Sequence, residues 1–159
     1  MGDFIVKRVF IVIGKSGSRK SSTIRALTGI GNKRRVLQIR TSDKKTINVF
    51  VCHTSLQEVK MTPEYFVEEV ENHEDNPESV LVALRNNASQ NRKYPNAEEY
   101  ISYFIKAGWQ IAGVASLHGG PTEFSIGNIS QLIPIQNSTQ IPTNEIAHII
   151  KGQWQWQWL

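Results

Sequence analysis

The chain has 159 residues, of which 40% are hydrophobic and 20% charged, a composition typical of globular domains and not of disordered chains. Its apolar runs, such as residues 9–13, are too short to cross a bilayer or to form a convincing signal peptide, so we expect a cytoplasmic protein without a membrane partner. The single cysteine, Cys52, excludes an internal disulfide and a cysteine-based metal cage. The length fits one domain over 1–159, with an aromatic C-terminal extension at 152–159.

Positive charge is concentrated in the first part of the chain. Residues 1–45 contain twelve Lys and Arg against two Asp, a net charge of +10, whereas the remainder carries six basic against twelve acidic residues, a net charge of −6. This asymmetry favours a polyanionic ligand, either a nucleotide or a nucleic-acid backbone. For roughly half of these residues, solvated surface charge is the simpler interpretation.

Alternating apolar runs and amphipathic segments predict an α/β fold with a largely parallel sheet. The first strand is predicted at 5–13, followed by a glycine- and serine-rich loop and a helix at 20–27 that Gly29 and Gly31 end. Two β-rich runs at 35–40 and 46–53 are separated by too few residues for a crossover helix. We therefore expect an antiparallel hairpin there.

The rest of the chain continues the alternation. Thr62, Pro63 and Glu64 predict the start of a helix that ends near His73. The elements expected after it are a buried strand at 79–84, a polar loop at 85–96, a helix at 97–107, a strand at 109–117, a turn at 119–121 and a last helix at 143–151. The proline-containing stretch 121–142 predicts an irregular excursion or an edge hairpin.

The loop after the first strand carries the clearest chemical pattern. Residues 14–21 read Gly-Lys-Ser-Gly-Ser-Arg-Lys-Ser, which resembles the phosphate loop G-x-x-x-x-G-K-[ST] with arginine in place of the second glycine. In that pattern, backbone N–H groups and the lysine bind phosphates, and the final hydroxyl ligates Mg²⁺. The predicted phosphate-binding residues are Gly14, Lys15, Ser16, Gly17, Ser18, Arg19, Lys20, Ser21 and Ser22, with Ser21 as the metal ligand. The simpler alternative is a Gly/Ser turn ahead of a basic helix.

The order of the predicted elements resembles the small Ras-like GTPases of the P-loop NTPase superfamily. The run from Gly14 to Gly29 is similar to the loop and first helix of Era-like, septin-like and immunity-associated GTPases. The resemblance implies a three-layer α/β/α sheet, mostly parallel with one antiparallel hairpin, that binds Mg²⁺ with GTP or ATP.

The later signatures of that family are altered. Where the family has D-x-x-G after the hairpin, this chain reads Cys-His-Thr-Ser-Leu-Gln-Glu at 52–58, which leaves Gln57 or Glu58 as candidates to position a water or the metal's shell. For the base-binding N-K-x-D the chain has Leu-Arg-Asn-Asn at 84–87, so the resemblance implies contacts from Asn86 and Asn87. An amide in place of the aspartate would lower selectivity for guanine. The family's S-A-K loop is reduced to Ser116 and its neighbours, and ATP, GTP, another nucleotide or none stay open.

Three further features each have more than one interpretation. Arg19 either crowds the phosphate loop and weakens binding, or folds its guanidinium over the phosphates as a finger in cis. The polar loop with Arg85, Arg92 and Lys93 is either solvated or a lid that clamps phosphate. The terminus Gln-Trp-Gln-Trp-Gln-Trp at 153–158 has the period of a strand with all tryptophans on one face, which docks on its own sheet or forms a contact with a protein partner or a second copy. Base stacking on this aromatic row is a third option.

The sequence thus favours a small nucleoside-triphosphate-binding protein that hydrolyses slowly, as a switch or scaffold. Two alternatives stay open. One is a non-catalytic module that binds nucleic acid or a protein through its basic face, and the other is a small-molecule kinase. The four histidines share no close spacing, so we expect no histidine metal cluster. No catalytic residue is assigned.

Overall fold

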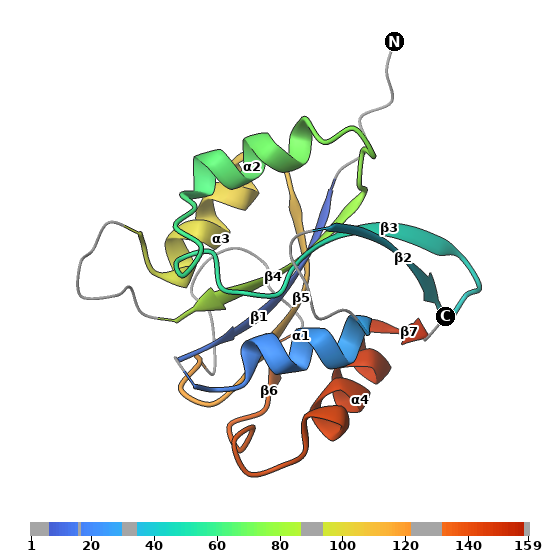
Figure 1. The fold of residues 1–159 in the computed structure, drawn as a ribbon, viewed down its shortest axis with the longest axis vertical. Helices are drawn as coiled ribbons and strands as arrows, with labels where there is room; N and C mark the ends of the chain where they lie inside the picture. Colours follow the sequence, from blue (N-terminus) through green and yellow to red (C-terminus); the bar gives the residue numbers. More distant parts are fainter. Residues whose placement is uncertain (1–6, 16, 30–34, 87–93, 122–131, 158–159) are drawn as a thin grey trace.

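The computed structural model describes residues 7–15, 17–29, 35–86, 94–121 and 132–157, which form seven strands and four helices (Figure 1). In chain order these are β1 (Arg8–Gly14), α1 (Lys20–Thr28), β2 (Arg35–Thr41), β3 (Thr46–Cys52), α2 (Pro63–Glu71), β4 (Ser79–Arg85), α3 (Ala97–Lys106), β5 (Gln110–Ser116), β6 (Leu132–Pro134), α4 (Thr143–Trp154) and β7 (Trp156–Gln157). The α/β class and nearly every predicted element are confirmed. The predicted residues 5 and 6 of the first strand and Gly31 lie outside the described residues.

The strands form one sheet in the order β6-β5-β1-β4-β3-β2-β7. Strand β1 lies at its centre and runs parallel to β4 and β5 on either side, while β3 is parallel to β4. Strands β2 and β3 pair antiparallel, which confirms the predicted hairpin. Because the carboxyl ends of β1, β3, β4 and β5 meet at one edge, the loops that follow these strands are brought together there.

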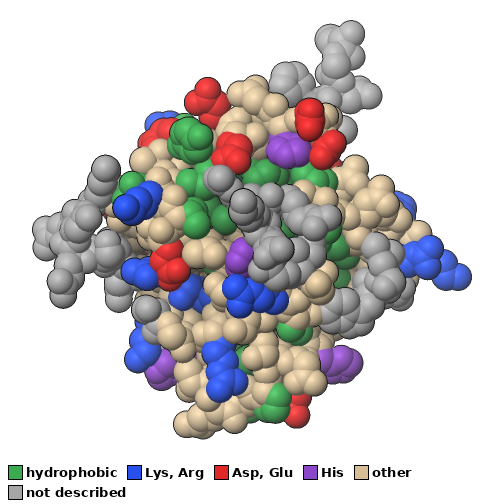
Figure 2. Space-filling view, in the orientation of Figure 1, with side chains coloured by type: hydrophobic (Ala, Val, Ile, Leu, Met, Phe, Trp, Pro, Cys, Tyr) green, Lys and Arg blue, Asp and Glu red, His purple; other side chains and the backbone are tan. Residues whose placement is uncertain are grey.

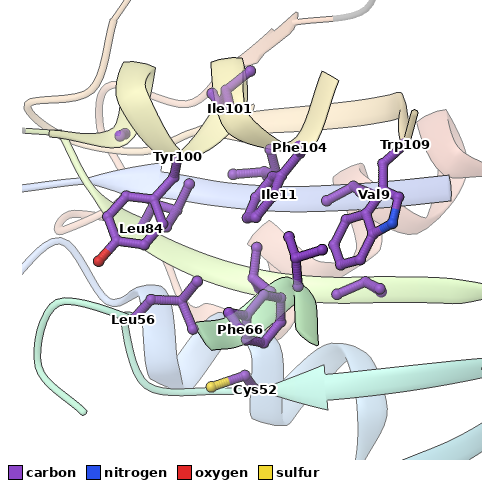
Figure 3. Packing of buried hydrophobic residues seen from close by; sticks show 14 of the residues in the cluster. Val9, Ile11, Cys52, Leu56, Phe66, Leu84, Tyr100, Ile101, Phe104 and Trp109 are labelled. Atoms are coloured by element: carbon purple, nitrogen blue, oxygen red, sulfur yellow. The ribbon is translucent and has the colours of Figure 1, made fainter. Parts of the chain in front are cut away.

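Helices cover both faces of the sheet. On one face, alternate residues of β1, Val9, Ile11 and Ile13, pack with residues of α2 and α3 (Figure 3). On the other face, Phe10 and Val12 pack with residues of α1 and α4. The core strands are therefore apolar on both sides, as expected of a parallel sheet covered twice.

The start of α2 and the end of α1 are formed by the residues that the sequence predicted for them. The Thr62 hydroxyl accepts a hydrogen bond from the Tyr65 N–H (3.2 Å) and caps α2, as predicted. Gly29, in left-handed backbone at φ 74°, ends α1 and donates its N–H to the Arg25 carbonyl. In the part of the chain that the structure describes, no helix is long and apolar enough to cross a membrane.

The described residues after the turn at 119–121 do not form the edge hairpin that was one of the two predictions for 121–142. Within its described residues, β6 pairs with β5 in parallel, with Ala115 opposite Ile133, and so extends the sheet at its edge. A hairpin would require antiparallel pairing, and residues 122–131 lie outside the described residues. The loop hydrogen bond from the Ile135 N–H to the Ser116 carbonyl (2.7 Å) continues this pairing.

The C-terminal tryptophans dock on the protein's own sheet, but not as one continuous strand. Trp154 is the last residue of α4, and only Trp156 and Gln157 form β7, antiparallel to β2. Gln155 between them takes a left-handed backbone (φ 59°), which ends the helix and brings both indoles against Phe10, with ring centroids 5.0 and 4.8 Å away. The prediction that a period-two ribbon places all three tryptophans on one strand face is therefore wrong for Trp154, and Trp158 lies outside the described residues.

Candidate functional site

The loop between β1 and α1 is curled. The carbonyl of Lys15 accepts two hydrogen bonds, one from the Ser18 N–H (3.2 Å) and one from the ammonium of Lys20 (2.8 Å). Lys20 thus folds back over the turn that precedes it, and its side chain is only 6% exposed although it lies at a helix start. Two loop residues have left-handed backbone, Gly17 at φ 80° and Arg19 at φ 75°.

Arg19 therefore adopts the backbone conformation that glycine adopts freely. For an L-residue this conformation costs about 1–2 kcal/mol, so the loop keeps a shape suited to glycine although arginine replaces it. The guanidinium donates a hydrogen bond to the Ile141 carbonyl (2.9 Å), just before α4. To act as a finger over a phosphate, this side chain has to leave that carbonyl.

The amino ends of α1 and α2 differ in their capping. The residue before the helix, Arg19, makes no side-chain cap, and its first turn contains no acidic residue, unlike the first turn of α2 with Thr62 and Glu64. The first N–H groups of a helix have no partner within the helix and carry its positive dipole end. A helix start of this kind, with a buried lysine beside it, suits an anion.

Burial governs the protonation of Lys20. Loss of water lowers the pKa of its ammonium, the Glu58 carboxylate partly restores the pKa, and the Arg85 guanidinium lowers it further. The charges of these two groups therefore act on Lys20. Burial also lowers the pKa of His53, with a further contribution from the charge of Arg25.

Close packing holds the start of the loop. A Cβ on Gly14 would lie 2.4 Å from the Ser18 Oγ, so only glycine fits without displacing Ser18. The Ser18 side chain is fully buried, and its hydroxyl has no hydrogen-bond partner among the described residues. Its carbonyl accepts a hydrogen bond from the Ser138 hydroxyl (2.9 Å), which also accepts one from the His118 N–H (3.0 Å). No local pattern in the sequence points to Ser138, because 120 residues separate it from Ser18.

Strand β4 places Arg85 and Asn86 beside this loop. Arg85 is paired with Gly14 in the sheet, and the Asn86 N–H donates to the Gly14 carbonyl (3.1 Å). The Asn86 side-chain amide donates to the Gly119 carbonyl (3.0 Å), so this residue joins the ends of β1 and β4 to the turn after β5. Its predicted companion, Asn87, lies outside the described residues.

The segment after the hairpin reaches the site across β4, which separates β3 from β1. Gln57 is buried, and its amide bonds the main chain on three sides: it accepts from the Arg85 N–H and donates to the carbonyls of Arg85 and Pro95 (3.0–3.1 Å). This side chain is therefore a structural bridge. Glu58 points to Arg85, whose Nη2 lies 2.9 Å from its carboxylate.

The Ser116 hydroxyl is engaged within its own turn. It donates to the Pro121 carbonyl (2.6 Å), and a Cβ on Gly120 would lie 2.3 Å from it. The Lys15 side chain covers Gly119, where an added Cβ would meet its Cγ at 2.6 Å. Ser116 and Lys15 thus fix the turn after β5 against the loop.

The possible metal ligands are few. Ser21 is half-buried on the first turn of α1, Ser22 is exposed beside it, and Ser16 lies outside the described residues. Across the described ranges, no group of three or more His, Cys, Asp or Glu side chains is placed to hold a metal ion. The candidate oxygen ligands that the sequence offered are the Ser21 hydroxyl and the Glu58 carboxylate, which is paired with Arg85. This set suits Mg²⁺ only when water and ligand oxygens complete the shell.

Comparison of the chain with known protein families, with curated proteins and with solved structures gave no match.

Proposed function

We propose that the protein binds a nucleoside triphosphate, GTP or ATP, through the loop 14–21, in a P-loop-like α/β/α fold. The observation that carries this proposal is the buried ammonium of Lys20, folded back onto the Lys15 carbonyl directly at the uncapped start of α1. The hydrogen bond of this buried ammonium goes to a neutral carbonyl, so an anion stabilises the cation further. In the proposed complex, the phosphates take hydrogen bonds from Lys20 and from the N–H groups of Gly17 and of Arg19 to Ser22, while the Ser18 N–H stays on the Lys15 carbonyl.

In this proposal, Mg²⁺ is held mainly by the phosphates of the bound nucleotide. The Ser21 hydroxyl supplies one oxygen, and the phosphates and waters supply the others. Residues 52–58, the segment after the hairpin, contain no Asp that could bind the metal, so slow hydrolysis is the expected activity. A switch or scaffold tolerates slow turnover, whereas a kinase requires an acceptor site for which no residue is assigned.

Calorimetric titration of the intact protein with Mg-ATP and Mg-GTP tests the proposal. We expect Lys20→Ala to remove binding, because the ammonium is the one buried cation in the loop, while Lys15→Ala, a matched exposed lysine in the same loop, changes affinity less. A ligand at 100 times its Kd stabilises the fold by about 2.7 kcal/mol, so a thermal shift provides a second readout. Absence of binding at millimolar nucleotide, or equal binding by Lys20→Ala, contradicts the proposal.

A second candidate function is nucleic-acid binding through the basic face, which the charge distribution favours. Figure 2 shows Lys and Arg side chains over the part of this face where α1 lies, and acidic side chains toward α2. The exposed basic residues in the described part of the first 45 are Arg8, Lys15, Arg19, Arg25, Arg40, Lys44 and Lys45. This function predicts polynucleotide binding that weakens steeply with salt and that survives Lys20→Ala.

A further inference from the structure

Arg85 occupies the position in the sheet closest to the start of the loop. It is the last residue of β4 and is paired with Gly14, the last residue of β1. Leu81 and Ala83, at alternate positions before it, pack in the cluster that contains α1 residues. Arg85 continues this alternation, so its side chain leaves the sheet on the face where α1 begins.

Glu58 holds the guanidinium of Arg85 with good geometry. Both Nε (3.2 Å) and Nη2 (2.9 Å) donate to one carboxylate oxygen of Glu58. The backbone beneath the pair is fixed, because Gln57 bonds both the N–H and the carbonyl of Arg85. The side chains themselves are partly open to solvent, 25% exposed for Arg85 and 38% for Glu58, so they are free to exchange partners.

Lys20 adds a second cation to this corner. Its ammonium is bonded to the carbonyl of Lys15, the residue that follows Gly14, and Gly14 is paired with Arg85 in the sheet. The Glu58 carboxylate is paired with Arg85 and also acts on the charge of Lys20, and the uncapped N–H groups of α1 add further positive potential. The corner is therefore short of negative charge.

We propose that Arg85 is a second phosphate-binding residue and that Glu58 holds its guanidinium until a polyphosphate replaces the carboxylate. Phosphate oxygens present the same bidentate acceptors to the guanidinium as a carboxylate, with more negative charge. After the exchange, Glu58 stays beside the loop without its partner. The affinity for a polyphosphate then depends on whether it has enough phosphates to reach Arg85 as well as the loop. This inference rests on the proposed function, since it requires a phosphate ligand at the loop.

Calorimetric titration with inorganic tripolyphosphate, compared with pyrophosphate, tests the exchange in the intact protein. We expect Arg85→Gln to weaken tripolyphosphate binding roughly tenfold or more, the loss of a hydrogen-bonded charge, with a smaller effect on pyrophosphate. Glu58→Gln should tighten tripolyphosphate binding up to about fivefold, because a competing partly exposed ion pair is removed. Matched surface controls on α3, Glu98→Gln and Lys106→Gln, should leave affinity unchanged.

The double variant separates exchange from simple repulsion. If Glu58 acts by holding Arg85, Glu58→Gln has no effect in the Arg85→Gln background. Equal tightening in both backgrounds overturns the exchange, as does tripolyphosphate binding that depends on Lys20 but not on Arg85. If the wild-type protein binds no polyphosphate, or binds it equally without Lys20, the proposed function itself fails and this inference with it.

Discussion

Substitution of Arg19 by glycine and by alanine measures whether the loop backbone has the shape on which phosphate binding depends. Arg19 lies at φ 75°, a conformation that costs an L-residue about 1–2 kcal/mol and glycine almost nothing. Glycine's extra freedom in the unfolded chain offsets about 0.4–1 kcal/mol of this gain. Both variants lose the bond to the Ile141 carbonyl equally, so that term cancels. We expect Arg19→Gly to be about 1 kcal/mol more stable than Arg19→Ala.

Urea denaturation followed by circular dichroism gives this difference, and thermal unfolding should show a higher Tm for the glycine variant by about 2–4 °C. Ser102, exposed within α3, is the control of opposite sign, because there alanine should be more stable than glycine by up to about 1 kcal/mol. If Arg19→Ala equals or exceeds Arg19→Gly in stability, residue 19 is not left-handed in solution and the loop is not curled as described. Nucleotide affinity in Arg19→Gly answers a separate question: an increase refutes the arginine finger.

Three further predictions concern packing and protonation. Gly14→Ala should destabilise the fold by about 1–3 kcal/mol, since its Cβ would press on Ser18 and Leu117, whereas Gly152→Ala, with open space around it, should be neutral or stabilising in the same denaturation assay. Trp156→Ala should cost about 3 kcal/mol of unfolding free energy through lost contact with Phe10, and an effect no larger than that of the exposed Gln153→Ala would show that β7 does not dock. Burial lowers the pKa of Lys20, so near that pKa the unfolded chain holds the proton more tightly than the folded chain. The unfolding free energy of the wild type should therefore rise relative to that of Lys20→Met as the pH approaches 10.5. A difference that falls with pH contradicts this burial.

Much of the fold was predictable because its signals are local. Thr62 and Pro63 define a helix start within a few residues, and the short connection at 42–45 leaves the hairpin as the only pairing for its strands. The order of strands in the sheet has no such local signal. The position of β4 between β1 and β3 depends on long-range packing, and it moves the segment after the hairpin one strand away from the loop.

Some residues of the candidate site were predictable from a local motif, and others were not. The spacing of Gly14 and Lys20 is readable as a motif, and the structure brings both into one curled loop. The partners that complete the corner are not readable, because Glu58 and Arg85 are 27 residues apart and Ser138 binds Ser18 across 120 residues. The prediction of one strand for the C-terminal tryptophans was wrong for Trp154, because a period-two pattern does not show where a helix ends. Gln155 ends α4 inside the repeat.

Backbone amide NMR of the ¹⁵N-labelled protein during titration with Mg-ATP and Mg-GTP tests phosphate binding at the loop most directly. We expect the largest shifts on the N–H groups of Gly17 to Ser22, and we expect these shifts to disappear in Lys20→Ala and to spare the amides of α2 and α3. Shifts confined to other elements, or no shift at millimolar nucleotide, would contradict it.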